Sequence, residues 1–414
     1  MRFLYQAGIF LYGLLLRILA PFHAKARLWV NGRKDHLKKI EQTVEQGQKH
    51  IWFHFASLGE FEQGRSVLEQ IRKRFPDEKI IVTFFSPSGF EIRKNTPLAD
   101  HVFYLPEDTA GNARKFIELI NPKFVVFTKY EYWYFYFREL KRRNIRLLMI
   151  SAIFREEQLF FKEYGGFYRN ILKNVSYFFT QNMDSVHMLK WIRITNAGLA
   201  GDTRFDRVVE LPKEHKEIEV VRDFVGGNRV LVAGSTWGQD EGLLKVLLDN
   251  HKGWKMILAP HEIHKEHINQ LMGLFPKALL FSKYESYSDL EKEQAQVLLI
   301  DNIGMLSSLY AYGDMAYIGG GFGAGIHNTL EAATYGIPVI FGPKYSKFQE
   351  AVDLLELGAG FSIGNQVELN EVFEALLADE KRLPAGTAAK NYVQQRAGAT
   401  QIIMKYLETE RLLG

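Results

Sequence analysis

Short, uninterrupted apolar runs alternate with segments of helical periodicity along most of this chain, and that alternation limits the possible fold more than any other feature. The runs lack the polar alternation of a half-exposed sheet, which is typical of parallel strands covered on both faces. They lie at 51–55, 80–85, 124–127 and 147–150, and again at 230–233, 255–258, 297–300, 315–318 and 338–341. Helical patterns such as 61–75 and 112–120 fall between them. The pattern predicts an α/β protein with two doubly wound, Rossmann-like domains.

Two such domains imply a cleft between them, with ligands bound beyond the carboxyl ends of the strands. A polar stretch at 211–228 separates the halves, and we place the interdomain linker near its start. The expected parts are a hydrophobic helix at 1–20, a first domain at 21–210, a second domain at 211–385 and a C-terminal segment at 386–414. We expect that segment to form one long helix over 388–412, packed back on the first domain.

Composition excludes several classes of protein. The 414 residues are 47% hydrophobic and 24% charged, which rules out a disordered chain, a coiled coil and a polytopic membrane protein. The chain has no cysteine, so disulfides, thiolate metal sites and a catalytic thiol are impossible. Residues 1–205 hold 32 basic and 20 acidic side chains, whereas the remainder holds 20 and 28. The basic half is expected to face an anionic partner.

The N-terminal segment 3–16 carries no charge and is followed by Arg17. As a helix it would reach about 21 Å, against about 30 Å for the core of a bilayer. Three interpretations remain open: a short or tilted membrane anchor with Arg17 reaching the lipid phosphates, a signal peptide cleaved near Ala24-Lys25-Ala26, and a helix buried on the protein. We carry forward attachment to a membrane.

A loop with five glycines at 319–325 joins the strand expected at 315–318 to a helical pattern. Such a loop brings backbone N–H groups to a phosphate at a helix N-terminus; the alternative is a turn that packs a helix against a strand. A dinucleotide is disfavoured, because the next strand ends in Gly342-Pro343 without an acidic residue for the ribose. We expect His327 or Asn328 to cap the helix and Glu331 to lie in its first turn. The loop residues expected to bind a nucleotide include Gly320 and Gly321.

Two other loops of the second half follow expected strands. Ser235 and Thr236 come after the run at 230–233 and are candidates for binding an anion, or form a plain helix cap. His261 and Glu262 follow the run at 255–258 and are interpreted as nucleotide contacts or surface residues. Their spacing with His264 matches no common zinc site.

Two carboxylates of the first half also follow expected strands. Glu60 lies at a glycine turn where a helix begins, so it either stabilises that helix or acts as a general base. Glu131 precedes a strongly aromatic run that is either core packing or the lining of an acyl-chain or sugar pocket. Arg204 lies near the domain junction, where its charge would neutralise developing phosphate or carboxylate charge. The chain contains no Asp-x-Asp, which argues against a metal-dependent nucleotide-sugar site.

Taken together, these motifs resemble a known family. The segments 53–60 (FHFASLGE), 131–133 (EYW), 201–206 (GDTRFD), 233–236 (AGST) and 327–331 (HNTLE), with Gly342-Pro343, are similar to those of the Kdo transferases of lipopolysaccharide synthesis. These enzymes transfer 3-deoxy-D-manno-oct-2-ulosonic acid (Kdo) from CMP-Kdo to a lipid A precursor. The resemblance spans the chain and implies the GT-B architecture, with the acceptor on the N-terminal domain and the donor on the C-terminal domain.

The resemblance also implies roles for individual residues. Glu60 matches the general base, and Glu131 and Arg204 match positions that stabilise the transition state. CMP contacts are implied at His261, Glu262, Ile303, Gly304, Met305, Asn328, Thr329, Leu330 and Glu331. The chain departs from the family in having Arg204 where lysine is frequent, and His261-Glu262 where Arg-His is frequent.

The resemblance implies an inverting transfer without metal or cofactor. It places the chain on the cytoplasmic side of the inner membrane, with CMP-Kdo and a lipid A precursor as its partners and no nucleic acid. The nearest alternative is another GT-B glycosyltransferase with a UDP-sugar donor. An NAD-dependent oxidoreductase and a non-catalytic lipopolysaccharide-binding protein are the remaining alternatives.

Overall fold

The computed structural model describes residues 1–413 and divides the chain into two compact units. The first unit is Met1–Arg207 together with the chain from Ala397 onward, and the second is Val208–Arg396. The division after Arg207 falls inside helix α10 (Thr203–Glu214), just before the polar stretch that the sequence suggested as a linker.

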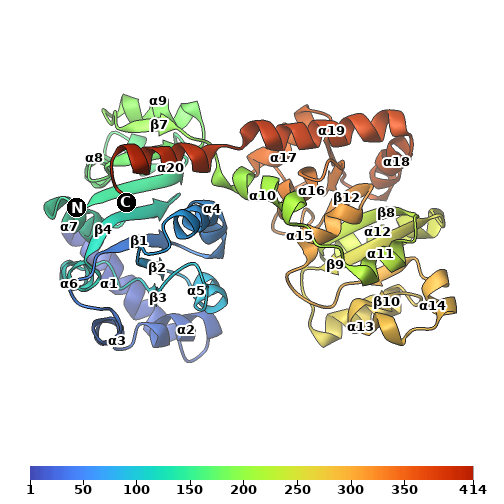
Figure 1. The fold of residues 1–414 in the computed structure, drawn as a ribbon, viewed down its shortest axis with the longest axis horizontal. Coiled ribbons are helices and arrows are strands. Elements are labelled where there is room, and N and C mark those ends of the chain that lie inside the picture. Colours follow the sequence, from blue (N-terminus) through green and yellow to red (C-terminus); the bar gives the residue numbers. More distant parts are fainter. Residues whose placement is uncertain (414) are drawn as a thin grey trace. The chain divides into compact units, whose positions relative to one another are not determined.

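A seven-stranded parallel sheet forms the centre of the first unit (Figure 1). Its order is β3-β2-β1-β4-β5-β6-β7. The winding reverses between β1 and β4, and such a switch point is where open α/β sheets bind ligands. The strands are β1 (His50–Phe55), β2 (Ile80–Phe84), β3 (His101–Tyr104), β4 (Pro122–Thr128), β5 (Arg146–Ala152), β6 (Tyr177–Thr180) and β7 (Ala197–Leu199).

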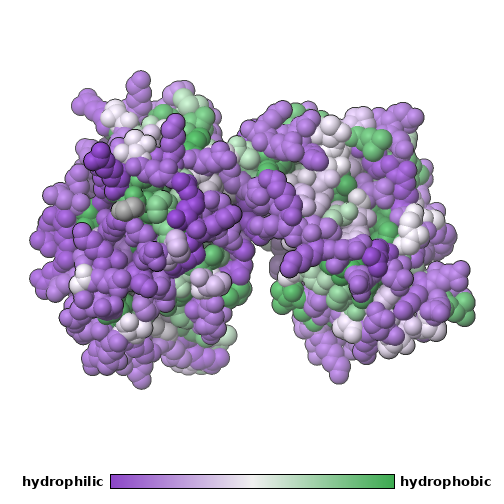
Figure 2. All heavy atoms as spheres, viewed as in Figure 1, coloured by the Kyte–Doolittle hydropathy of each residue, from purple (hydrophilic) through white to green (hydrophobic). Residues whose placement is uncertain are grey.

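Helices cover both faces of this sheet, which is why every residue of β1 is buried. One face packs against α4 (Leu58–Arg74) and α20 (Ala399–Thr409), and the surface over these helices is mostly hydrophilic (Figure 2). The other face packs against α3 (His36–Thr43), α6 (Ala110–Ile120), α7 (Tyr134–Arg142), α8 (Gly166–Leu172) and α9 (Met183–Trp191). The shorter helices α2 (Ala24–Gly32) and α5 (Pro87–Arg93) complete the unit.

Helix α1 (Arg2–Leu19) is long and apolar enough to cross a membrane by length and composition. It nevertheless packs along the first unit by one face. The Tyr5 hydroxyl donates a hydrogen bond of 2.6 Å to Asp108, and Arg17 pairs with Glu107 at 2.6 Å. Gly13, between them, is buried. The interpretation of this helix as a buried one therefore holds for one face only, because most of its large apolar side chains are exposed.

The second unit is built on another seven-stranded parallel sheet, of order β10-β11-β9-β8-β12-β13-β14. Its switch point lies between β8 and β12. The strands are β8 (Arg229–Thr236), β9 (Trp254–Pro260), β10 (Leu279–Leu280), β11 (Val297–Leu299), β12 (Met315–Ile318), β13 (Val339–Phe341) and β14 (Gly360–Ser362). The helices are α11 (Glu219–Val225), α12 (Gly238–Asn250), α13 (Lys265–Leu274), α14 (Asp289–Gln294), α15 (Leu306–Leu309), α16 (Leu330–Ala333), α17 (Gln349–Glu356), α18 (Gln366–Leu377) and α19 (Asp379–Arg396).

The expectation of one C-terminal helix over 388–412 is wrong. Two helices, α19 and α20, are separated at Ala397-Gly398. Gly398 has a φ of 120°, which side-chain-bearing residues rarely adopt. Asp206 stabilises the chain between the two helices, because its carboxylate accepts hydrogen bonds from the N–H groups of Gly398 (2.5 Å) and Thr400 (2.9 Å). The helical periodicity continues across the break, so the glycine alone marked it in the sequence.

Candidate active site

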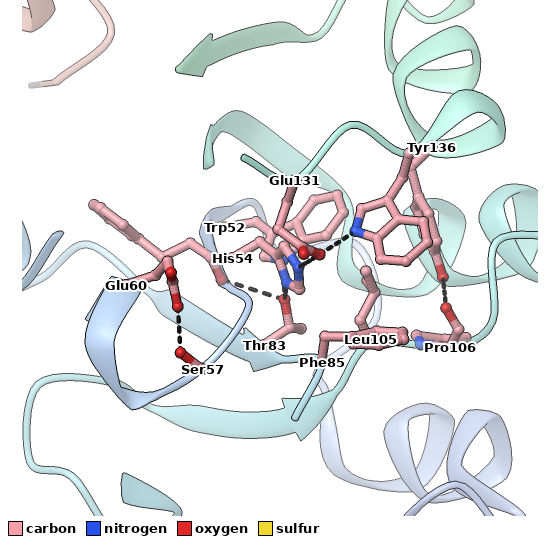
Figure 3. A network of polar contacts seen from close by, with 12 residues as sticks. Trp52, His54, Ser57, Glu60, Thr83, Phe85, Leu105, Pro106, Glu131 and Tyr136 are labelled. Carbon is pink, nitrogen blue, oxygen red and sulfur yellow. Dashed lines mark hydrogen bonds and ion pairs between the residues drawn. The ribbon is translucent and has the colours of Figure 1, made fainter. Parts of the chain in front are cut away.

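Glu60 lies at the carboxyl end of β1, in the first turn of α4 (Figure 3). Ser57 occupies the N-cap position of α4, and its hydroxyl donates a hydrogen bond to the Glu60 carboxylate. The strand ends at Phe55, as the sequence predicted, whereas the helix begins at Leu58, before the predicted helical pattern at 61–75. The partial positive charge of the helix N-terminus stabilises a carboxylate in this position.

Glu131 follows β4, so its loop and that of Glu60 leave neighbouring strands at the switch point. Its Oε2 atom accepts a hydrogen bond of 2.6 Å from the Trp133 indole N–H and lies 3.3 Å from Nε2 of His54 (Figure 3). The side chain is 18% exposed, so it is held in the protein yet remains accessible. In the aromatic run that follows, Phe135, Tyr136 and Phe137 are buried in the core, as the packing interpretation expects.

The position of Glu131 depends on a buried polar chain. His54 is fully buried in β1, and its Nδ1 atom lies 2.8 Å from the Thr83 hydroxyl oxygen. That hydroxyl accepts a hydrogen bond of 2.8 Å from the Trp52 indole. Because an indole only donates, the Thr83 proton is left for His54 Nδ1 or for the Phe53 carbonyl, and the carbonyl is the more distant acceptor at 3.4 Å. We therefore assign the His54 proton to Nε2, where it donates to Glu131.

Arg204 is the second residue of α10 and is held by Asp202. Its Nε and Nη2 atoms both lie 2.9 Å from Asp202 Oδ2. Thr203 fixes the start of α10 to α4, since its hydroxyl donates a hydrogen bond to the Gln63 carbonyl. Arg204 is thereby attached to the same helix that carries Glu60.

Tyr130 lies close enough to Glu60 and Arg204 for both charges to affect the pKa of its phenol. Burial raises the pKa of the Tyr130 phenol, Arg155 and Arg204 oppose the rise, and Glu60 and Asp202 add to it. A single phenol therefore responds to both the predicted base and the predicted cation. Glu60 and Glu131 lie after the neighbouring strands β1 and β4, and Arg204 acts on the same phenol as Glu60.

A cavity of about 540 Å³ opens beside this group. Its walls are mainly aromatic, and the Glu131 side chain forms part of them. The size and lining are typical of small-molecule sites. The lining residues are Tyr130, Glu131, Tyr132, Trp133, Glu157, Gln158, Leu159, Phe160 and Tyr168.

The predicted donor residues lie in the second unit, beyond the carboxyl ends of β8, β9 and β12. Ser235 is half-buried at the end of β8, with a φ of 54°. The hydroxyl of Thr236 is buried and donates a hydrogen bond of 3.1 Å to Glu241. Of the two hydroxyls, only Ser235 remains accessible to an anion.

The glycine loop after β12 is tightly packed against its neighbours. A Cβ atom on Gly321 would lie 2.6 Å from the backbone of Gly342. The loop is also held by the buried carboxylate of Asp240, which accepts the Gly320 N–H at 3.0 Å. Loop N–H groups that donate within the protein are those of Gly319, Gly320, Gly323 and Gly325. The packing interpretation of this loop is thus borne out for these groups, which are not free to cradle a phosphate.

Three aromatic rings form a stack above this loop. His261 packs against both Trp237 and His327, with ring centroids 4.6 Å and 4.5 Å away and interplanar angles near 25°. Trp237 Nε1 donates to His327 Nε2 at 3.3 Å. Burial lowers the pKa of His327, and the nearby His261 lowers it further. The stack therefore favours a neutral His327 that accepts this hydrogen bond.

The segment 327–331 begins α16 as expected. Asn328 Oδ1 accepts the N–H of Leu330 at 3.1 Å, and its amide donates to Glu331 at 3.0 Å. Thr329 occupies the N-cap position of α16, Asn328 one residue earlier accepts the first N–H of the helix, and Glu331 lies in its first turn. Thr329 and Leu330 are fully buried. The loop before α15 contains Ile303, Gly304 and Met305, and Ile303 is 86% exposed. Glu262 is also exposed, 3.1 Å from His264. Among residues 1–413, no group of three or more His, Asp or Glu side chains is arranged to hold a metal ion.

Comparison with known proteins finds similarity to Kdo transferases. Residues 31–207 match the model of the 3-deoxy-D-manno-octulosonic-acid transferase (kdotransferase) family. The chain is 27% identical to the 3-deoxy-D-manno-octulosonic acid transferase of Rickettsia felis over 380 residues, 89% of this chain and 80% of that protein. It is 28% identical to that of Aquifex aeolicus over 353 residues, 83% of this chain and 90% of that protein.

In sequence, the chain is similar to Kdo transferases over most of its length. It is a glycosyltransferase, as the resemblance implied. The matched region contains Glu60, Glu131 and Arg204.

Solved structures confirm the GT-B-like fold of this chain. The UDP-GlcNAc 2-epimerase of Neisseria meningitidis, bound to UDP-GlcNAc, superposes with a TM-score of 0.61 at 15% identity, covering 87% of this chain and all of that one. MurG of Acinetobacter baumannii gives a TM-score of 0.56 at 11% identity, covering 87% of this chain and all of that one. At such low identity these likenesses support the fold alone.

Sequence reasoning missed several residues of the two loop clusters. Trp237 directly follows the predicted Ser235-Thr236 pair, and an exposed tryptophan after a strand was the available signal. His54 lies within the quoted segment 53–60 and Tyr130 directly precedes the segment 131–133, and neither was given a role of its own. Asp240 carried no signal, since an aspartate three residues after a helix cap is common.

Proposed function

We propose that this glycosyltransferase transfers Kdo from CMP-Kdo to a lipid A precursor, with inversion and without a metal. The observation that carries the proposal is the placement of Glu60, in the matched region, at the switch-point end of β1 with its carboxylate in the first turn of α4. A carboxylate here can accept a proton from a substrate hydroxyl at the edge of the sheet.

The proposed reaction has one displacement. Glu60 takes the proton of the acceptor hydroxyl, whose oxygen forms a bond to the anomeric carbon of Kdo. The bond from that carbon to the CMP phosphate oxygen breaks, and CMP leaves as the anion. The transition state resembles an oxocarbenium ion, and Glu131 and Arg204 stabilise the developing charges.

The donor is proposed to bind the second unit. Ser235 contributes a hydroxyl, and His261 with Trp237 offers a ring surface on which a nucleobase can stack. Glu331 is suited to ribose or sugar hydroxyls rather than to phosphate. The remaining proposed contacts are His327, Asn328 and the exposed loop at 303–305.

Incubation of the protein with CMP-Kdo made in situ and a tetraacyl disaccharide bisphosphate, followed by mass analysis of the lipid, tests this function. We expect the lipid to gain one or more Kdo units. Competition by CMP but not UDP is expected for the donor site. A UDP-selective site, or no Kdo-bearing lipid, would contradict the proposal.

We also propose that α1 attaches the enzyme to the cytoplasmic face of the inner membrane by lying in the plane of the surface. Its inner face is committed to Asp108 and Glu107, so a docked α1 cannot also be surrounded by lipid. Its outer face presents a continuous apolar surface, with Phe10 65% and Leu11 60% exposed. Such a helix inserts one face at the headgroup boundary. The exposed apolar residues are Phe3, Leu4, Phe10, Leu11, Leu14, Leu15, Ile18 and Leu19.

A Phe10→Ser/Leu11→Ser variant tests this attachment. We expect it to move from the membrane fraction to the soluble fraction while its thermal unfolding stays unchanged. The control is Trp191→Ser, which removes a 70% exposed ring from α9 of the same unit. Equal membrane binding of all three proteins would rule out α1 as the attachment.

A further inference from the structure

A basic pocket lies between the start of α6 and the outer side of α7. Its volume is about 490 Å³, and it is distinct from the aromatic cavity beside Glu131. Its lining includes three arginines and one glutamate. The lining residues are Ala110, Gly111, Arg114, Phe135, Arg138, Glu139 and Arg142.

The charge of this pocket is not balanced by its own glutamate. Arg142 donates two hydrogen bonds to Glu139, of 2.9 and 2.7 Å, and Arg143 donates one of 2.7 Å. These bonds hold the pKa of Glu139 at about 2. The carboxylate is therefore ionised, and Arg142 and Arg143 already balance its negative charge. Arg114 and Arg138 make no ion pair with any residue between 1 and 413. Two guanidinium groups therefore face the pocket with their charge available.

The pocket adjoins the N-terminal end of α1. The guanidinium of Arg2 lies 5.5 Å from the ring centre of Phe135, which lines the pocket. Tyr5 packs on the same ring at 6.2 Å. On the outward side of this turn of α1, Phe3 is 79% and Leu4 64% exposed. Cationic and apolar surfaces are thus contiguous here.

We propose that this pocket binds the phosphate of an anionic phospholipid of the bilayer. Guanidinium groups bind phosphate oxygens in a bidentate manner, and Ala110 and Gly111 belong to the first turn of α6, whose dipole favours an anion. A headgroup phosphate lies just above the acyl region, the depth at which an in-plane α1 would hold the pocket. The inference rests on the proposed position of α1 and adds the identity of the lipid group that is bound.

Vesicle sedimentation with an Arg114→Gln/Arg138→Gln variant tests the pocket; Arg142 is kept because it holds Glu139. The probes are phosphatidylcholine vesicles with and without phosphatidylglycerol. We expect the variant to lose about 30-fold in affinity for the anionic vesicles, since each basic contact contributes several-fold. Its affinity for pure phosphatidylcholine should equal that of the wild type, because α1 is intact.

The control is Lys73→Gln/Lys405→Gln, with the same change of net charge on α4 and α20, on the opposite face of the sheet. It should keep the anionic preference to within about threefold. Equal losses in both variants, or none in the pocket variant, would overturn the proposal. The proposal would also be overturned if the pocket variant bound vesicles like the wild type but had a raised KM for the acceptor in neutral micelles. The pocket would then bind a phosphate of the acceptor lipid. Loss of binding to both vesicle types by the Phe10→Ser/Leu11→Ser variant reports on α1 alone, and vesicle binding does not depend on transfer.

Discussion

The loops after β4 and β12 occupy equivalent places in the two sheets, yet they are built in different ways. Each is held by a buried aspartate that accepts two backbone N–H groups and one tyrosine hydroxyl. Asp108 accepts from Phe135, Tyr136 and Tyr5 in the first unit. Asp240 accepts from Trp237, Gly320 and Tyr317 in the second.

What the two loops present is different. The β4 loop offers the charged side chain of Glu131, fixed by buried donors. The β12 loop offers close-packed backbone and the edge of a ring stack. The proposed chemistry therefore resides in the first unit and depends on individual side chains. The second unit depends on shape, and its substitutions should affect stability or donor binding.

Among the substitutions in the two units, Glu60→Gln is expected to have the largest effect on turnover. Removal of a general base lowers turnover by about 10³-fold, while CMP binding and thermal unfolding stay as in the wild type. Steady-state kinetics with CMP-Kdo and calorimetry with CMP measure the two effects. Glu62→Gln on the same helix, which only weakens ion pairs with Arg65 and Arg93, is the control and should stay within about threefold. Turnover by Glu60→Gln within tenfold of wild type would remove the assignment.

The pH dependence of unfolding tests the aspartate of the first unit. Burial raises the pKa of Asp108 to about 6, against hydrogen bonds from Tyr5, Phe135 and Tyr136 that lower it. A raised carboxyl pKa means that the folded state takes up the proton first. Its contribution to the free energy of unfolding is therefore complete below about pH 4 and is lost as the pH rises through 6, by at most about 3 kcal/mol.

The measurement is urea unfolding of wild type and Asp108→Asn between pH 4 and 7.5. The difference in free energy, wild type minus variant, should grow as the pH falls. A constant difference over this range would show that Asp108 does not titrate there. Because Glu139 has a pKa of about 2, it stays ionised throughout and does not obscure the result.

The sequence predicted the framework of both sheets and the placement of the site on it. Continuous apolar runs identified β1, β2, β4, β5, β8, β9, β11, β12 and β13. It missed β3 (His101–Tyr104), β6, β7, β10 and β14, each of which has only two to four residues. β3, β7 and β14 contain polar or small residues, whereas the apolar segments of β6 and β10 are shorter than the runs used for the prediction. The motifs that carry the family resemblance lie at the ends of strands and in the loops that directly follow them.

The interactions that hold the site were not predictable in the same way. His54 reaches Glu131 from a different strand, and the two are 77 positions apart in the chain. Asp206 breaks the C-terminal helix from 192 positions away. Such contacts depend on the tertiary arrangement, so periodicity and local motifs do not reveal them. The glycine loop misled because glycine serves close packing as well as phosphate binding.

His54 and Trp133, which donate hydrogen bonds to Glu131, allow a second test of the first loop. Trp133→Phe keeps an aromatic ring but removes the indole donor, and we expect a 10- to 100-fold loss of kcat, because a hydrogen bond to a charged group contributes about 1.5–3 kcal/mol. His54→Asn should act similarly. Since both donors hold the same oxygen, the double variant should lose less than the product of the two.

Tyr317→Phe is the matching change in the second unit, where it removes a hydrogen bond of 2.8 Å to Asp240. It should lower stability by about 1 kcal/mol and change kcat by less than threefold. A larger effect on kcat in Tyr317→Phe than in Trp133→Phe would reverse the comparison between the two units.

Two neighbouring glycines separate packing from phosphate binding in the second loop. A Cβ on Gly321 would meet the Gly342 backbone at 2.6 Å, whereas on Gly323 it would meet nothing closer than 3.5 Å. Gly321→Ala should therefore cost about 1–3 kcal/mol of stability, as overpacking does, and Gly323→Ala almost none. Thermal unfolding and CMP affinity are measured for both. If Gly323→Ala weakened CMP binding at unchanged stability, the loop would contact the donor phosphate at its exposed tip, and the second unit would share with the first a direct part in binding the reacting groups.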